Sequence, residues 1–244
     1  MQDSNEPKIS EPTPLVDRRD FLGGATMLAG TSLLGLAAPM SAAEPAGGAV
    51  PAAPAEMPAD RMPPIPPEKY TEAQKKAAAE ITSGPRGALV GPFIPLLRSP
   101  ELMSRLQRVG EYLRFEGKFE ANIREFIILI IARQWTQQFE WYSHESLALK
   151  AGVKPETIKA IAEMRRPSEM TPDETMLYDF ISELRLRQSV SDAAYAPVVK
   201  RFGEQGIIDI TVLCGYYTLL GMMMNTTRTP LPPGTPLPLA TFPQ

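Results

Sequence analysis

The sequence predicts an all-α fold, and three observations support this prediction. Helix-start signals recur between residues 70 and 192, and apolar residues follow them at spacings of three and four. No stretch alternates apolar and polar residues as a half-buried strand would. The third observation is a long apolar run with charged ends at residues 120–136, which is typical of a buried helix. We therefore expect a helical bundle, which we place at residues 68–230.

The first 67 residues are expected to lie outside the bundle. Residues 1–43 are similar to a twin-arginine export signal, because Arg18-Arg19 precedes an apolar, glycine-containing run that ends in small residues. That run is also close to the ~18 residues of a membrane-spanning helix, so an uncleaved anchor is the alternative. Residues 44–67 are rich in alanine and proline and predict an extended, mobile linker. Export would make the protein periplasmic or secreted.

Two helices are predicted before the apolar run. Thr71 and Gln74 form a capping box at the start of the first, and Gly84 ends it. A loop rich in glycine and proline follows and carries Arg86. Ser99 and Pro100 begin the second helix as N-cap and first-turn proline. Its apolar stripe consists of Leu102, Leu106, Val109 and Leu113, and Gly117 ends it.

The central part of the chain predicts a buried helix over residues 120–136 and another over 139–151, which Gly152 ends. The sequence leaves open whether these are two helices or one bent helix. Further helices are expected from Pro155 to about residue 164 and from a capped start at Thr171. The last predicted elements are a helix over 192–203 with a kink at Pro197, an apolar helix over 207–224 and a proline-rich extended tail over 231–244.

Composition excludes several classes of function. The formal net charge is −3 and there is no long basic run, which argues against nucleic acid as a partner. Cys214 is the only cysteine, so an intrachain disulfide and CxxC redox chemistry are impossible. A single histidine excludes a metal site with several histidines in one chain.

The candidate catalytic residues surround this one histidine, His144. Glu140 precedes it by four residues, so the two side chains lie on one face of a helix. Glu125 lies near the head of the preceding apolar helix. An imidazole titrates near neutral pH, and a carboxylate beside it can orient the ring and hold its charge. The alternatives are a structural histidine, an exposed ion pair between His144 and Glu140, and an ordinary helix-start acid at Glu125.

Several segments together resemble the carboxymuconolactone decarboxylase family, of the alkylhydroperoxidase D-like superfamily of all-helical proteins. They are GPFIPLLRSPEL, REFIILIIARQW, FEWYSHESLALKAGV and GYYTLLGMMMN. The resemblance covers residues 84–233. In the peroxidase branch of that superfamily a glutamate, a CxxC pair and a histidine form a thiol and proton-relay system. Glu125 and His144 match the glutamate and the histidine, whereas Gln137 and Glu140 stand at the cysteine positions.

The resemblance therefore implies a protein without thiol peroxidase chemistry. The glutamate at position 140 is similar to the decarboxylase branch, which acts without thiols and without a cofactor. That branch converts 4-carboxymuconolactone to an enol-lactone with loss of carbon dioxide. On this basis we expect a cofactor-free lyase or proton-transfer enzyme that acts on a small carboxylated lactone or a related acid. His144, Glu125 and Glu140 would be catalytic, and Trp141, Tyr142 and Arg86 would bind substrate.

Two other functions stay open. One is an exported, non-catalytic binding or assembly protein that keeps the fold, in which His144 would adjoin no cavity. The other is a different proton transfer, such as isomerisation, in the same pocket. The very apolar helices and the resemblance to ring-forming hexamers also predict a homo-oligomer, either a dimer, a trimer or a hexamer, without a membrane partner once the signal is cleaved.

Overall fold

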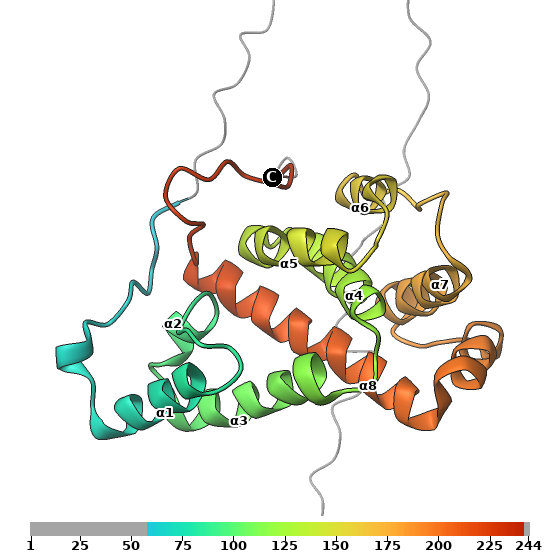
Figure 1. The fold of residues 1–244 in the computed structure, drawn as a ribbon. Coiled ribbons are helices and arrows are strands. Elements are labelled where there is room, and N and C mark those ends of the chain that lie inside the picture. The colour runs from blue at the N-terminus through green and yellow to red at the C-terminus, as the bar shows by residue number, and fades with distance from the viewer. Residues whose placement is uncertain (1–57, 242–244) are drawn as a thin grey trace, which may run out of the picture. The chain divides into compact units, whose positions relative to one another are not determined.

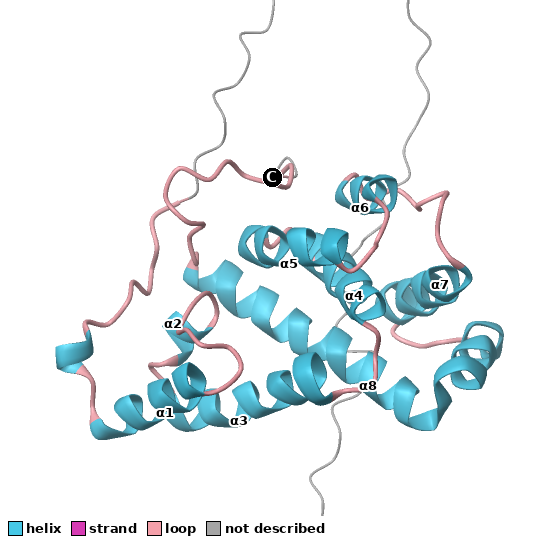
Figure 2. Ribbon diagram, viewed as in Figure 1, coloured by secondary structure: helices cyan, strands magenta, loops and turns pink. Residues whose placement is uncertain are grey.

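The structure of the protein is a computed structural model that describes residues 58–241. These residues form helices and loops without any strand, in agreement with the predicted all-α class (Figures 1 and 2). The elements are η2 (Pro67–Lys69), α1 (Glu72–Ser83), α2 (Phe93–Leu96), α3 (Pro100–Glu111), η3 (Tyr112–Glu116), α4 (Ala121–Gln134), α5 (Gln138–Lys150), α6 (Pro155–Ala162), α7 (Pro172–Arg187) and α8 (Asp192–Thr227). The predicted export signal lies outside the described residues.

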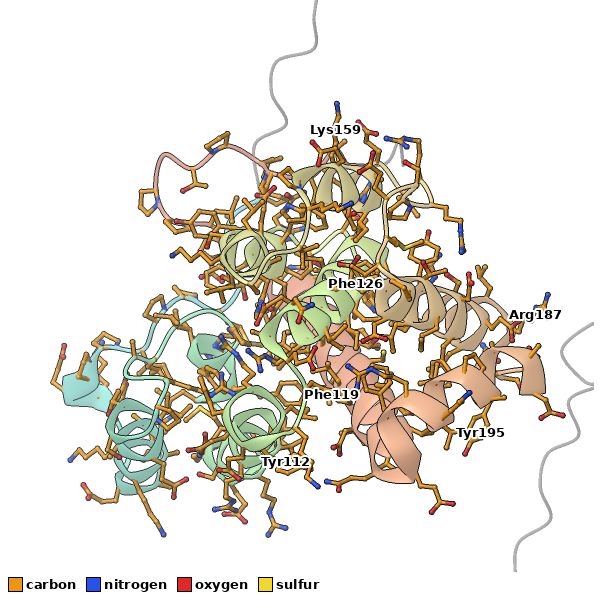
Figure 3. The ribbon with its side chains drawn as sticks, turned by 45° about the vertical axis from the view of Figure 1, so that its right-hand side comes forward. Tyr112, Phe119, Phe126, Lys159, Arg187 and Tyr195 are labelled. Carbon is orange, nitrogen blue, oxygen red and sulfur yellow. The ribbon has the colours of Figure 1, made fainter. Side chains whose placement is uncertain are left out.

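Helix α4 is the buried centre of the bundle, as its sequence predicted. It packs against α5, α6, α7 and α8, and every side chain from Phe126 to Arg133 is buried. Phe126 lies at the centre of the packed side chains, whereas Lys159, Arg187 and Tyr195 lie at the periphery (Figure 3). A helix that is apolar on all sides is stable only where other elements cover it, and here four helices do so.

The junction after α4 shows that α4 and α5 are two helices. Thr136 has a φ of 45°, which interrupts the helical backbone. The side chain of Gln137 then accepts hydrogen bonds from the backbone N–H groups of Phe139 and Glu140, at 2.6 and 3.0 Å. This cap satisfies donors that the first turn of a helix leaves without partners. The chain changes direction at this point, so α5 packs against α4 (Figure 1).

The predicted kink at Pro197 is wrong. The described backbone of α8 departs from helical geometry at Gly203, where φ is 72°. Glycine adopts this left-handed conformation without the strain that a Cβ would cause, so the chain bends there. Pro197 lies within the shorter first arm, and the long second arm crosses the bundle against α4 (Figure 1).

Both ends of the described chain contact the bundle. Residues 58–67 were predicted to belong to a mobile linker, but Arg61 donates hydrogen bonds from its backbone and side chain to the carbonyls of Thr227 and Thr226. In the tail, Gln138 exchanges two hydrogen bonds of 2.9 and 3.0 Å with the backbone of Leu239, whose side chain is buried. The tail therefore lies against α5 of its own chain.

Candidate active site

Helices α4 and α5 bring the single histidine against a glutamate. The Nδ1 atom of His144 lies 2.6 Å from Oε2 of Glu125, and both side chains are buried. The two residues are 19 positions apart, so only the change of direction between the two helices can produce this contact. The other oxygen of Glu125 accepts a hydrogen bond of 3.3 Å from Nε of Arg124.

Glu140 approaches the opposite nitrogen of the same ring. Its Oε2 atom lies 3.3 Å from Nε2 of His144, one helical turn away on α5. Glu140 is 4% exposed, so this is a buried pair and not the exposed ion pair that was the alternative. The imidazole is thus held between two carboxylates that come from two consecutive helices.

This arrangement stabilises the protonated ring. Burial alone would lower the pKa of His144, but the hydrogen bonds and charges of Glu125 and Glu140 outweigh it and raise that pKa above its ordinary value. Burial likewise tends to raise the pKa of Glu125, but the contact with His144 lowers it overall. Both shifts favour the pair in its charged form, an imidazolium beside a carboxylate.

A cavity of about 270 Å³ adjoins the ring. His144 and Glu140 line it, whereas Glu125 lies behind the ring. The remaining lining residues come from the loop before α2, from α2, η3, α5 and α8: Pro85, Arg86, Ala88, Val90, Pro92, Phe93, Arg114, Phe115, Phe139, Ser143, Leu147, Tyr216, Tyr217 and Leu220. Its volume is near the lower end of the ~300–1,000 Å³ of small-molecule sites, so it suits a small metabolite.

Two tyrosines from α8 form part of this cavity wall. The ring of Tyr217 meets His144 edge-to-face at 5.2 Å between centroids, and Tyr216 meets Tyr217 in the same way at 5.6 Å. Burial raises the pKa of Tyr216 to about 12 and raises that of Tyr217 well above its ordinary value. Both hydroxyls therefore stay protonated at neutral pH, so each has a proton that it can donate in a hydrogen bond.

The structure places only one of the three predicted substrate-binding residues at the cavity. Arg86 lines it. Trp141 is 1% exposed and packs in the hydrophobic core, and Tyr142 is 43% exposed on the outer surface of α5. Successive helical residues are about 100° apart around the axis, so the neighbours of Glu140 in sequence do not share its face.

Sequence reasoning missed Tyr216, Tyr217 and Arg114 as cavity residues. In the sequence, the two tyrosines stood out only as part of GYYTLLGMMMN, one of the segments that carry the resemblance and part of a predicted apolar helix. Their distance in sequence from His144 gave no signal that they would meet it. Arg114 lies in η3, a π-helical turn, and such turns are frequent at functional sites but are not recognisable from sequence periodicity.

No thiol lies in this site. Gln137 and Glu140 occupy the positions that resemble those of the peroxidase cysteines, and Gln137 caps α5. Cys214 is buried, does not line this cavity, and has a pKa raised by burial to about 12. Among residues 58–241, no group of His, Cys, Asp and Glu side chains is arranged to hold a metal ion.

Comparison with known proteins agrees with this geometry. Residues 100–179 match the carboxymuconolactone decarboxylase family. The matched segment contains Glu125, Glu140 and His144, and its central elements are α4 and α5. The resemblance seen in the sequence is confirmed for this domain.

A solved structure has a fold similar to that of this chain. It is a crystal structure of an alkylhydroperoxidase AhpD core, an uncharacterised peroxidase-related protein from Ralstonia eutropha JMP134. The two chains have 16% sequence identity and a TM-score of 0.59, and the match covers 72% of this chain and 94% of that one. At this identity the likeness establishes an AhpD-like fold. No curated protein matches the chain.

Proposed function

We propose that the protein is a cofactor-free lyase that removes carbon dioxide from a small carboxylated lactone or a related acid. The observation that carries this proposal is the buried imidazole held between Glu125 and Glu140 at the wall of a cavity. Membership of residues 100–179 in the decarboxylase family supports the reaction class.

The proposed reaction requires a group that donates a proton to a carbon atom of the intermediate. When the bond between the ring carbon and the carboxylate breaks, its electron pair moves through the adjacent double bond to the lactone carbonyl and forms a dienolate. The protonated His144 then gives a proton to carbon, and the neutral enol-lactone results. Glu140 lies on the cavity side of the ring, so it can steer Nε2–H and return a proton from solvent.

Glu125 would serve as a positioning residue. It touches Nδ1 from behind the ring and does not line the cavity. Its negative charge holds the imidazole in one orientation and favours the protonated ring. The trio therefore combines a proton donor, a proton exchange partner and a fixed counter-charge.

The non-catalytic alternative is not favoured, because it required that His144 adjoin no cavity. Isomerisation in the same pocket differs from decarboxylation in its product. We expect the full-length protein in D₂O to release CO₂ from 4-carboxymuconolactone or a related lactone acid, with one deuterium on carbon in the product. Deuterium incorporation without CO₂ would indicate isomerisation instead, and turnover of no lactone acid by either route would contradict the proposal.

We also infer that α8 mediates self-association. By length and hydropathy α8 is the one helix in residues 58–241 that could span a membrane, but half of its most apolar stretch is buried in the bundle. The exposed side of its long arm carries Ile208, Val212, Gly215, Leu219 and Met222. Their spacing alternates between four and three, as in the seam of two paired helices, and includes no charged residue. A second copy of the same helix fits such a seam.

The substitution Leu219→Glu tests this interface. Leu219 is 39% exposed, and a charge there would be desolvated in a helix pair. We expect the variant to sediment as a monomer while the wild-type protein sediments as an oligomer. The matched control is Leu186→Glu, because Leu186 is 74% exposed and lies on α7, away from the exposed apolar side of α8. The inference would be refuted if the wild-type protein sedimented as a monomer. It would also be refuted if the Leu219→Glu variant sedimented as an oligomer of the same size as the wild-type protein.

A further inference from the structure

Arg86 is the first of two polar groups at the cavity with buried atoms that have no hydrogen-bond partner in the described part of the chain. Its guanidinium lies over the ring of Phe93, at 4.7 Å from the centroid. The Nε and Nη2 atoms are buried, and neither has a hydrogen-bond partner among residues 58–241. A guanidinium carries five N–H donors in a fixed fork, and leaving them desolvated and unpaired is costly. This cost indicates that the side chain is arranged to donate to a ligand.

The hydroxyl of Tyr216 is the second such group. It is also buried and has no hydrogen-bond partner in the described part of the chain. The hydroxyl of Tyr216 and Nη2 of Arg86 both lie against Gly110. A Cβ at Gly110 would overlap both atoms, so the two donors are neighbours. Three elements thus converge on one point: the loop after α1, helix α3 and helix α8. The buried Gly110 provides the space in which both donors fit.

The charges around this point favour an anion. Arg114 lines the same cavity as Arg86, and its positive charge disfavours the charge of Arg86. None of the ion pairs formed by residues 58–241 includes Arg86 or Arg114. Among residues 58–241, Glu140 is the only acidic side chain that lines the cavity, and it is paired with His144. Among the described residues, the charges of Glu111 and Glu125 act on Arg86 and Arg114 only from beyond ion-pair distance, so a bound anion would supply the close counter-charge.

We propose that Arg86 and Tyr216 form a carboxylate-binding subsite, with Arg114 as a second positive charge and Gly110 as the residue that keeps the subsite open. A carboxylate has two oxygens that can accept from the guanidinium fork and from a phenolic hydroxyl at once. The aromatic rings of Phe93 and Phe115 line the same cavity and suit a flat organic acid. This subsite deepens the proposed function, since it names the groups that would hold the acid substrate, but its binding can be measured without turnover.

Binding of simple acids to the full-length protein tests the subsite by calorimetry. The probes are acetate and benzoate as carboxylates and benzamide as an uncharged match for benzoate. We expect benzoate to bind about tenfold or more tightly than benzamide, because a charge-assisted pair replaces a neutral contact. Arg86→Gln should abolish this preference, and Tyr216→Phe should weaken benzoate binding by about three- to tenfold. Gly110→Ala should weaken both carboxylates because its Cβ fills the space between the donors.

The matched control is Arg105→Gln, which removes an exposed arginine on α3 that pairs with Glu101. It should leave all three affinities unchanged. If Arg86→Gln does not fold, Tyr216→Phe decides the question, because it removes a single oxygen atom. Failure of both acetate and benzoate to bind, or equal binding of benzoate and benzamide, would overturn the subsite even if the protein released CO₂. Selective binding of benzoate by a protein that turns over no lactone would sustain the subsite and contradict only the proposed reaction.

Discussion

Replacing His144 by glutamine should lower kcat/KM for CO₂ release by about 10²- to 10⁴-fold, the usual contribution of a positioned proton donor. Glutamine has a similar reach and can still hydrogen-bond to Glu125, but it cannot give up a proton at neutral pH. His144 is the only histidine in the chain, so no other imidazole can take over its role. Steady-state kinetics on the lactone acid that the wild-type protein turns over would measure the loss.

A control and a pH profile separate catalysis from folding in this experiment. Tyr142→Phe changes an exposed residue two positions away on the same helix and should leave the rate unchanged. The wild-type rate should fall as pH rises through the raised pKa of His144, because the proton donor is then lost. In Glu140→Gln that fall should move to lower pH, since one of the two carboxylates that raise the pKa is gone. A His144→Gln variant with wild-type kcat/KM would remove His144 from the mechanism.

The helices and the trio could be predicted from sequence because their signals are local. Caps and apolar spacing give the starts of α1 and α7, where Thr71 and Thr171 form the expected capping boxes. The pairing of Glu140 with His144 follows from a spacing of one helical turn. The contact between Glu125 and His144 was expected from a resemblance, and the structure supplies its physical cause, which is the change of direction at Thr136 and Gln137.

The rest of the cavity depends on contacts between distant segments. Trp141 and Tyr142 directly follow Glu140 in sequence. The rotation of about 100° per helical residue nevertheless places Trp141 in the core and Tyr142 at the solvent-exposed surface. The aromatic partners of His144 come from α8, and an apolar helix gives no periodic signal for the side that faces a cavity. The buried donors of Arg86 and Tyr216 that have no hydrogen-bond partner among residues 58–241 can be identified only when the burial and hydrogen bonds of each atom are known.

Replacing Glu125 by alanine should lower the free energy of unfolding by about 3–5 kcal/mol at pH 6, the usual cost of removing one partner from a buried ion pair. His144 would then keep a charged or polar Nδ1–H in the core without its acceptor. Glu140→Ala is the matched control, because it removes the same side chain from the same ring on the side that faces the cavity. Water can enter there, so its cost should be clearly smaller. Urea unfolding of both variants measures the difference.

The pH dependence of this cost follows from the two pKa shifts. The raised pKa of His144 gives stability that is fully present below 6.5 and is lost as pH rises through the folded-state value. The lowered pKa of Glu125 gives stability that is present above 4.5 and is lost as pH falls through its folded-state value. The destabilisation by Glu125→Ala should therefore be largest between these limits and smaller in strong acid and in alkali. A loss below about 1 kcal/mol at pH 6, or one independent of pH, would show that the pair is not the buried imidazolium–carboxylate that the mechanism needs.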